Sequence, residues 1–275
     1  MVKKIFRKIR DRFLVPVNRS LSELEVKSNV ILSKLDMISK KLALDENILV
    51  TNEANFFIPN SPQDLIQTYM LNARDFWERD LLKKLDKYIC QDSIILDIGA
   101  NIGNHTIYWG KITKVKRIYA FEPIASTYRI LEKNIQINNL STVVKSFNYC
   151  LGDKSTQARI RKGHYTPDNI GATSLEANNG GGICIHALDD IDEIKRETEI
   201  HFCKIDCEGF EKWVLLGMKQ TFLRCRPIVL IESFPGIEQF DFVYDFMRKL
   251  GYEEPEAMGE SNYLFVYDKQ LGSET

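Results

Sequence analysis

The stretch that decides the fold is Ile94-Ile95-Leu96-Asp97-Ile98-Gly99-Ala100-Asn101-Ile102-Gly103-Asn104-His105-Thr106. Its first five residues are apolar apart from Asp97, which is typical of a buried strand, and a turn rich in Gly and Asn leads into a helix. Gly99 and Gly103 allow the backbone to bend sharply and a ligand to approach closely. The start of the helix offers backbone N–H groups without helical partners. The stretch therefore predicts a strand–loop–helix unit that holds a nucleotide-like ligand.

An acid follows at the distance that such a ligand requires. Glu122 ends the next predicted strand, nineteen residues past Gly103, where it can accept both ribose hydroxyls of an adenosine. Dinucleotides and S-adenosylmethionine share that ribose, so the two ligands are distinguished by the residues that bind the rest of the molecule. A pyrophosphate favours a loop of glycines alone, whereas an ammonium group and a sulfonium favour a carboxylate such as Asp97. The loop lacks the third glycine of G-x-G-x-x-G and carries Asn101 in place of the second, which favours S-adenosylmethionine.

Outward from this unit, short apolar strands alternate with helical patterns. The predicted strands are Ile94–Ile98, Arg117–Phe121, Val143–Asn148, His201–Ile205, Ile228–Ile231 and Tyr263–Tyr267. Helical patterns occupy residues 105–111, 125–138, 212–222 and 238–250. This alternation implies a parallel sheet covered on both faces. Residues 153–200 depart from this alternation. Their alternating stretch and glycine-rich turn predict an inserted β-hairpin beside the end of the sheet where the ligand is expected to bind.

Four blocks, in this order, resemble the signature of FkbM-type methyltransferases. They are Asp97-Ile-Gly-Ala-Asn-Ile-Gly103-Asn-His-Thr, Phe121-Glu122-Pro123, Leu151-Gly152-Asp153 and Lys204-Ile-Asp206-Cys-Glu208-Gly209-Phe-Glu211. The resemblance covers roughly residues 75–268. It implies a class I methyltransferase with a Rossmann-like α/β fold: a seven-stranded, mostly parallel sheet with an antiparallel last strand. It also implies S-adenosylmethionine as the cofactor and, usually, O-methylation.

The same resemblance implies which residues contact the cofactor. They are Asp97, Gly99, Asn101, Gly103, Asn104 and Glu122, with Asn148 as a candidate for the adenine. Cys207 stands where such proteins usually carry an aliphatic residue, which leaves the chemistry unchanged.

Methyl transfer to a hydroxyl is an in-line displacement that needs an aligned oxygen and a base. In an open α/β sheet the reacting groups lie at the carboxyl ends of the strands. Asp206 ends the fourth strand and is predicted to position the acceptor hydroxyl or the amine of the cofactor. Glu208 and His105 are alternative bases. Glu232 lies on the same rim, but pairing with a nearby arginine is an alternative for it, as helix packing is for His105.

Two carboxylates on one rim also leave a divalent-metal site as an alternative, but no spacing of ligand residues supports such a site and no metal is expected. His201, Cys203 and Cys207 lack C-x₂-C spacing and predict a packed core strand instead of a metal site.

The first 62 residues are predicted to form an appendage to a methyltransferase domain at 63–275. It comprises a basic segment at 1–19, a coiled-coil helix at 20–45 and a linker at 46–62. The residues at heptad spacing are Leu21, Leu24, Ser28, Ile31, Leu35, Ile38 and Leu42. They favour a homo-oligomer, a trimer or tetramer, through residues 20–43; the alternative is packing of the helix on the rest of the chain.

Composition bounds the remaining possibilities. A chain of 275 residues with 44% hydrophobic and 27% charged residues is not a disordered chain, a collagen-like fibre or a small disulfide scaffold. The formal net charge of −1 conceals a charge of +6 on residues 1–20, and the total argues against a nucleic-acid binder. Residues 1–19 form either a membrane-surface segment or a solvated tail. Because no signal-type apolar run follows them, a cytoplasmic location is expected, with the inner face of the membrane as an option.

The leading hypothesis is an S-adenosylmethionine-dependent O-methyltransferase that acts on a hydroxyl of a carbohydrate in a surface glycan. The carbohydrate rests on family analogy alone. The alternatives are an O-methyltransferase of a small-molecule or natural-product hydroxyl, a nucleotide-dependent dehydrogenase and a catalytically inert oligomeric scaffold. The loop spacing opposes the dehydrogenase, and the intact Asp97, Glu122 and Asp206 oppose the inert scaffold.

Overall fold

The computed structural model describes residues 24, 26–34, 47–162, 168–169, 172–178, 180–234, 238–259 and 261–267. The chain divides into two compact units, Met1–Ile48 and Leu49–Thr275. In the first unit, residues 26–34 are helical with exposed side chains. Most of the predicted coiled coil and all of the basic segment lie outside the described residues, so both stay predictions. No helix of the described part combines the length and the apolar character needed to cross a membrane.

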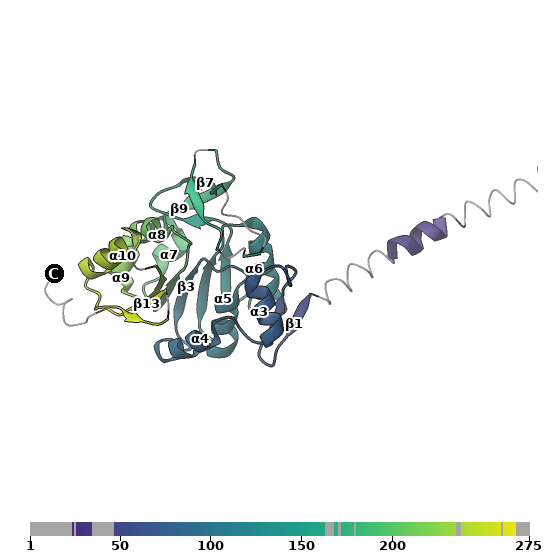
Figure 1. Cartoon of the computed structure of the whole chain (residues 1–275), viewed down its shortest axis with the longest axis horizontal. Helices are drawn as coiled ribbons and strands as arrows, with labels where there is room; N and C mark the ends of the chain where they lie inside the picture. Colours follow the sequence, from purple (N-terminus) through teal and green to yellow (C-terminus); the bar gives the residue numbers. More distant parts are fainter. Residues whose placement is uncertain are drawn as a thin grey trace, which may run out of the picture. The chain divides into compact units, whose positions relative to one another are not determined.

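The described part of the second unit is built on a seven-stranded sheet with the order β12-β13-β11-β10-β3-β4-β5 (Figure 1). Its strands are β3 (Ile94–Ile98), β4 (Arg117–Phe121), β5 (Val144–Phe147), β10 (Phe202–Ile205), β11 (Ile228–Glu232), β12 (Glu256–Ala257) and β13 (Asn262–Phe265). β3, β4, β5, β10 and β11 run parallel, and β13 runs antiparallel to β11. The predicted α/β fold with a mostly parallel sheet is confirmed.

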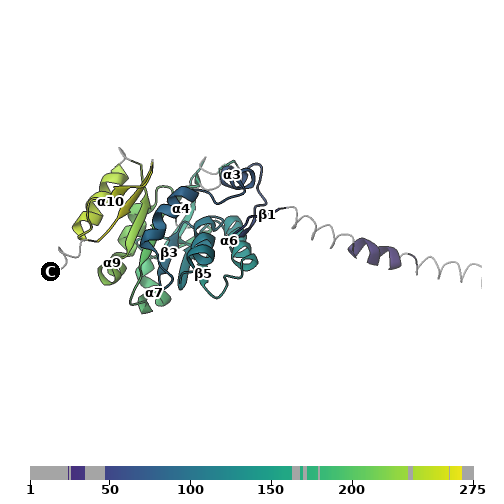
Figure 2. The same ribbon diagram turned by 90° about the horizontal axis from the view of Figure 1, so that it is seen from below.

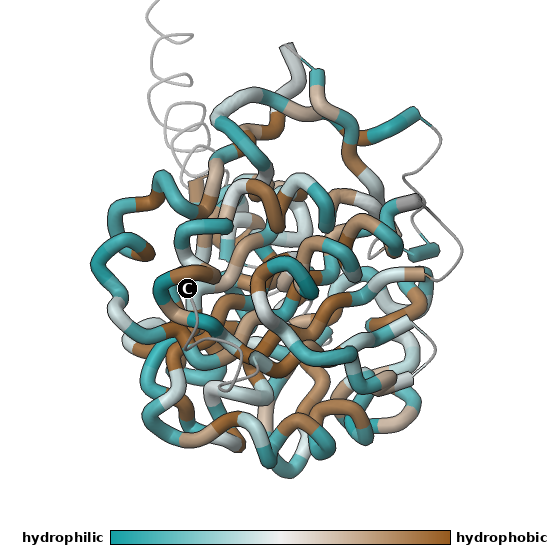
Figure 3. The backbone as a smooth tube through the Cα atoms, turned by 90° about the vertical axis from the view of Figure 1, so that its left-hand side faces the viewer, coloured by the Kyte–Doolittle hydropathy of each residue, from teal (hydrophilic) through white to brown (hydrophobic). Residues whose placement is uncertain are grey.

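Helices cover both faces of this sheet (Figures 1 and 2). They are α3 (Leu65–Ala73), α4 (Arg79–Leu85), α5 (Asn104–Tyr108), α6 (Ala125–Ile137), α7 (Asp192–Arg196), α8 (Glu211–Gly217), α9 (Lys219–Cys225) and α10 (Glu238–Lys249). Short helical turns add η2 (Asp86–Tyr88), η3 (Trp109–Thr113) and η5 (Leu188–Asp190). Successive strand residues point to opposite faces, so Ile95 packs with α4, α5 and α6, whereas Leu96 packs with α7, α8 and α9. Figure 3 shows the hydrophobic segments gathered in the interior between these layers.

The insertion after β5 is larger than the predicted hairpin. It forms a four-stranded sheet from β6 (Cys150–Leu151), β7 (Thr156–Ile160), β8 (Leu175–Ala177) and β9 (Ile183–His186), with the order β6-β9-β7-β8. The antiparallel pair β7–β8 corresponds to the predicted hairpin, and the sequence did not indicate the whole sheet because β6 has two residues and β8 has three, which is too short for an alternating pattern.

Part of the segment predicted as a linker is folded. β1 (Ile48–Val50) and β2 (Asn55–Phe57) form a two-stranded sheet, and the side chain of Phe56 is fully buried. Two buried amides hold this segment, Asn134 on α6 and Asn138 just after it. The side chains of Asn138 and Asn134 accept hydrogen bonds from the backbone N–H groups of Asn55 and Phe57, respectively. A polarity pattern does not reveal such partners, so the sequence indicated a linker.

The close approach of α8 to the turn after β6 gives a test of the fold. A Cβ atom at Gly217 would lie 1.8 Å from the carbonyl oxygen of Gly152. We therefore expect Gly217→Ala to lower the free energy of unfolding by about 3 kcal/mol, because the backbone must shift. Gly182→Ala, where a Cβ atom meets nothing within 4 Å, is the matched control. Urea unfolding measures both, and equal midpoints for the two variants would contradict the packing.

Candidate active site

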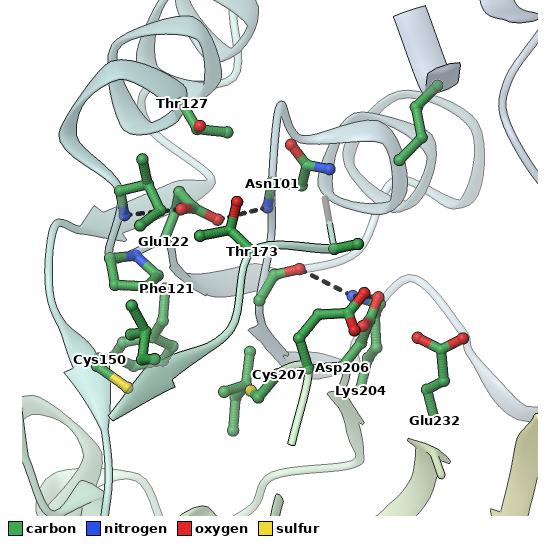
Figure 4. Close-up of a pocket in the computed structure, with 18 of the residues that line it drawn as sticks. Asn101, Phe121, Glu122, Thr127, Cys150, Thr173, Lys204, Asp206, Cys207 and Glu232 are labelled. Atoms are coloured by element: carbon green, nitrogen blue, oxygen red, sulfur yellow. Dashed lines mark hydrogen bonds and ion pairs between the residues drawn. The ribbon is translucent and has the colours of Figure 1, made fainter. Parts of the chain in front are cut away.

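The carboxyl ends of β3, β4, β10 and β11 open into a pocket of about 390 Å³ (Figure 4). Its lining includes Asn101 from the glycine loop, Glu122 from the end of β4, Asp206 from the end of β10 and Glu232 from β11. Residues of the insertion, such as Thr173, line it as well. The volume lies within the range of small-molecule and cofactor sites, and the place is where open α/β sheets bind ligands.

The glycine loop adopts a conformation that few residues accept. Gly99 has a φ of +78°, and a Cβ atom there would lie 1.7 Å from the carbonyl oxygen of Asp206. Asn101 has a φ of +50°, which asparagine tolerates better than most residues do, and it occupies the place of a second glycine. The loop therefore packs directly on the end of β10 and presents the backbone of Asn101 to the pocket.

Glu122 is a buried carboxylate with both oxygens engaged by backbone groups. It accepts hydrogen bonds from the N–H of Asn101 at 3.0 Å and the N–H of Ile124 at 2.8 Å (Figure 4). Burial nevertheless raises the pKa of Glu122 to about 7. Each carboxylate oxygen keeps a lone pair, so Glu122 can also accept hydrogen bonds from ligand hydroxyls. Thr127 and Thr173 line the same pocket, and their buried hydroxyls have no hydrogen-bond partner among the described residues.

A buried lysine joins the glycine loop to the end of β10. The Nζ of Lys204 donates to the carbonyl oxygen of Gly99 at 2.9 Å and lies 3.0 Å from Oδ2 of Asp206 and 3.7 Å from Oδ1 of Asp97. Burial favours a raised pKa for Asp206, but Lys204 and a hydrogen bond from Glu232 hold the pKa below its usual value. For the fully buried Asp97, burial outweighs Lys204 and raises the pKa.

Three carboxylates crowd the far end of the pocket. Oxygens of Asp206, Glu208 and Glu232 lie within 4.8 Å of one another, which makes them the group among the described residues that could ligate a cation. Burial, followed by the charge of Asp206, raises the pKa of Glu208 to about 7 and that of Glu232 to about 8. Glu208 has a φ of +47°, a strained value of the kind that recurs at functional sites. Glu232 accepts a hydrogen bond from Ser261 at 2.8 Å, and none of the ion pairs found in the described part of the chain joins it to an arginine.

The structure brings together some of the predicted cofactor residues. Gly99, Asn101 and Glu122 line the pocket, whereas Asp97, Gly103, Asn104 and Asn148 do not. Asp97 contacts Lys204 from outside the pocket lining, and Gly103 is the residue that precedes α5. The side chain of Asn104 exchanges two hydrogen bonds with the backbone of Trp77, and that of Asn148 donates to the carbonyl oxygen of Glu122 at 2.9 Å. These four residues support the lining.

Of the predicted catalytic residues, Asp206 and Glu208 line the pocket and His105 does not. The first turn of α5 directs His105 towards Trp109, with ring centroids 5.5 Å apart. Its Nε2 lies 3.5 Å from a carboxylate oxygen of Glu78, which does line the pocket. Burial lowers the pKa of His105 to about 3, so its ring is neutral. This placement favours Glu208 over His105 as the base.

Several lining residues were not predicted, and they differ in whether the sequence carries a signal for them. Lys204 had one, because a lysine inside an apolar strand needs a buried counter-ion. Trp77, Glu78, Phe234 and Asn262 had none, because they come from loops and strand ends whose approach depends on the tertiary fold.

Comparisons with known proteins give a consistent result. A family model described as the Methyltransferase FkbM domain matches residues 97–254, more than half of the chain. The chain is 27% identical over 168 residues to the hexuronic acid methyltransferase AglP of Haloferax volcanii, a match that covers 60% of this chain and 65% of AglP. It is 38% identical over 150 residues to Methyltransferase 1 of Beauveria bassiana, covering 46% of this chain and 59% of that protein. The chain thus spans less than two thirds of the length of both relatives.

Among solved structures, the chain resembles the methyltransferase FkbM from Methylobacillus flagellatus KT, with a TM-score of 0.47 and 18% sequence identity. That match covers 65% of this chain and 44% of the other.

The buried lysine gives a test of the electrostatic arrangement. Lys204→Met leaves Asp97 and Asp206 without their counter-ion, so we expect the free energy of unfolding to fall by about 3–5 kcal/mol at neutral pH. Protonation of the two carboxyls relieves this loss, so the deficit should shrink as the pH falls from about 8 to about 5.

Lys145→Met, which removes an exposed pair with Glu193, is the control, with an expected loss of about 1 kcal/mol or less. Urea unfolding across this pH range measures both variants. A deficit for Lys204→Met that does not change with pH would contradict the assignment.

Proposed function

Because the chain belongs to the FkbM methyltransferase family, we propose that it transfers a methyl group from S-adenosylmethionine to a hydroxyl of a carbohydrate. S-adenosylmethionine is the cofactor of this family. The observation that carries the proposal is the pairing of Glu122 with the glycine loop at one end of a pocket whose other end holds Asp206 and Glu208. The pocket therefore provides a place for an adenosine and, beyond it, for a proton acceptor.

The residues present fit the cofactor. Glu122 can accept hydrogen bonds from ribose hydroxyls beside the two backbone N–H groups that already hold it. The partnerless hydroxyls of Thr127 and Thr173 are further polar groups that a bound ligand can satisfy. The bound cofactor supplies an electrophilic methyl group on a positively charged sulfur. The acidic residues around Asp206 complement that charge.

The residues at the other end have distinct roles in the proposal. Lys204 keeps Asp206 ionised, so Asp206 can accept a hydrogen bond that orients the acceptor hydroxyl or the amine of the cofactor. A pKa of about 7 suits Glu208 to take the hydroxyl proton near neutral pH. His105 lies outside the lining, and its lowered pKa makes it a weak proton acceptor, so the proposal gives it no role.

The carbohydrate acceptor has narrower support. The relative AglP is named a hexuronic acid methyltransferase, which favours a sugar over other hydroxyl-bearing acceptors. A glycan on a surface is a further step of the same family analogy.

Calorimetric titration with S-adenosylmethionine tests the cofactor site. We expect Glu122→Ala to weaken binding at least about tenfold, because hydrogen bonds to a carboxylate contribute about 1.5–3 kcal/mol each. Binding to the unmutated protein should weaken as the pH falls through about 7, where Glu122 becomes protonated, and should approach a tenfold loss per pH unit.

Glu199→Ala is the control, since Glu199 is exposed and precedes β10, whereas the pocket lies at the carboxyl end of that strand. NAD should show no binding. Absence of S-adenosylmethionine binding by the unmutated protein, or binding of NAD in its place, would contradict the proposal.

The role of Glu208 is tested by the pH profile of methyl transfer at saturating S-adenosylmethionine. The rate should rise as the pH passes through about 7 and then level off, because Glu208 must be ionised to take the proton. Glu208→Gln should lower the rate by about 10²-fold or more and remove the limb near pH 7, with a smaller loss of cofactor affinity than Glu122→Ala causes. A variant that keeps the limb would show that another group is the base.

A further inference from the structure

The pocket has a one-sided charge. Five carboxylates line it, those of Glu78, Glu122, Asp206, Glu208 and Glu232, and among the described lining residues Lys204 is the one cation. Its ammonium group is already occupied by the carbonyl oxygen of Gly99 and the carboxylates of Asp206 and Asp97. The described lining therefore leaves no cation free to receive an anionic group of a substrate.

The end of the pocket away from Glu122 combines acidic, amide and aromatic groups. Figure 4 shows Glu232 and Glu122 on opposite sides of Lys204 and Asp206. Glu208 lies close to Glu232, and Asn262 pairs with Glu232 between β13 and β11. Phe234 follows Glu232 by two residues and also lines the pocket, with 55% of the residue exposed. Carboxylate oxygens and an amide accept hydrogen bonds from hydroxyl groups. An exposed aromatic ring offers a flat apolar surface, which the C–H face of a sugar ring can cover.

Given the proposed function, we propose that the acceptor is a sugar without an anionic group. Its hydroxyls donate to Glu208 and Glu232, one face of its ring packs on Phe234, and the carboxylates exclude sugars that carry an anionic group. The acceptor thus differs in charge from the hexuronic acid named for the relative AglP.

The crowding of the carboxylates supports this assignment. Burial and the charge of Asp206 already raise the pKa of Glu208 to about 7 and that of Glu232 to about 8. A further carboxylate in the same space would add a like charge to a group whose oxygens lie within 4.8 Å of one another. A hydroxyl group adds no charge and supplies a further hydrogen-bond donor to these oxygens.

The test compares sugars that differ in one group, with methyl transfer from radiolabelled S-adenosylmethionine as the readout. The probes are the methyl glycosides of glucose, glucuronic acid and glucosamine, with the galacto and manno series in parallel. At about pH 8 we expect at least one neutral glycoside to be methylated with a kcat/KM at least about a hundredfold above that of its uronic acid counterpart. The amino sugar, which carries no anionic group, should also exceed the uronic acid.

Two variants locate the acceptor end. Phe234→Ala should raise the KM for the neutral glycoside about tenfold or more, Phe234→Tyr should restore it, and cofactor affinity should be unchanged in both. Glu232→Gln keeps the shape and removes a charge, so it should reduce the discrimination against the uronic acid about tenfold. Trp213→Ala, at an exposed aromatic residue on α8 that does not line the pocket, is the control.

Each outcome decides between the two proposals. A uronic acid that is methylated better than its neutral counterpart would overturn the inference. So would methylation of none of the glycosides by a protein that binds S-adenosylmethionine, because the cofactor site would then stand without a sugar acceptor. Loss of S-adenosylmethionine binding itself would overturn the proposed function instead.

Discussion

The ammonium group of Lys204 is the contact on which the site depends. It bridges the carboxyl ends of the two central strands, because it binds the carbonyl oxygen of Gly99 after β3 and the carboxylate of Asp206 after β10. A charge buried to this extent is stable only when it is paired and hydrogen-bonded, and Lys204 satisfies both conditions. Lys204 also ties the glycine loop to the end of β10, where Gly99 lies too close to the backbone of Asp206 for any side chain. The positions of the cofactor loop and of the candidate catalytic acids are therefore set together.

The same lysine separates the acidities of neighbouring carboxyl groups. Asp206 lies next to the ammonium group and keeps a pKa below its usual value, whereas Glu208 and Glu232 are partly buried beside an ionised Asp206 and have raised pKa values. Pairs of acids whose environments push their pKa values apart are common in sites that move protons. One residue can then hold a hydrogen bond as an anion while its neighbour exchanges a proton near neutral pH.

Much of the sheet could be predicted because its strands obey local rules. The bounds of β3 and β4 match those predicted, since each is an apolar run that ends at a turn residue or an acid. The position of Glu122 could also be predicted, because its separation from the glycine loop is a number of residues along the sequence. His105 could not, since the direction of a side chain in the first turn of α5 depends on how that helix packs on Trp109. The contacts of Lys204 and Phe234 involve residues of other elements, and the sequence does not identify those partners.

A single electrostatic constraint links the cofactor to the acceptor. Because the lining carries five carboxylates and its one described cation is fully engaged, the pocket favours ligands with positive charge and disfavours those with negative charge. A dinucleotide brings a pyrophosphate, whose negative charge the acidic side chains of the described lining disfavour. S-adenosylmethionine brings a sulfonium and an ammonium group, so the charge that disfavours the dinucleotide favours this cofactor. An acceptor that enters the same pocket meets the same field, so selection against anionic sugars requires no additional residues beyond those that suit the cofactor.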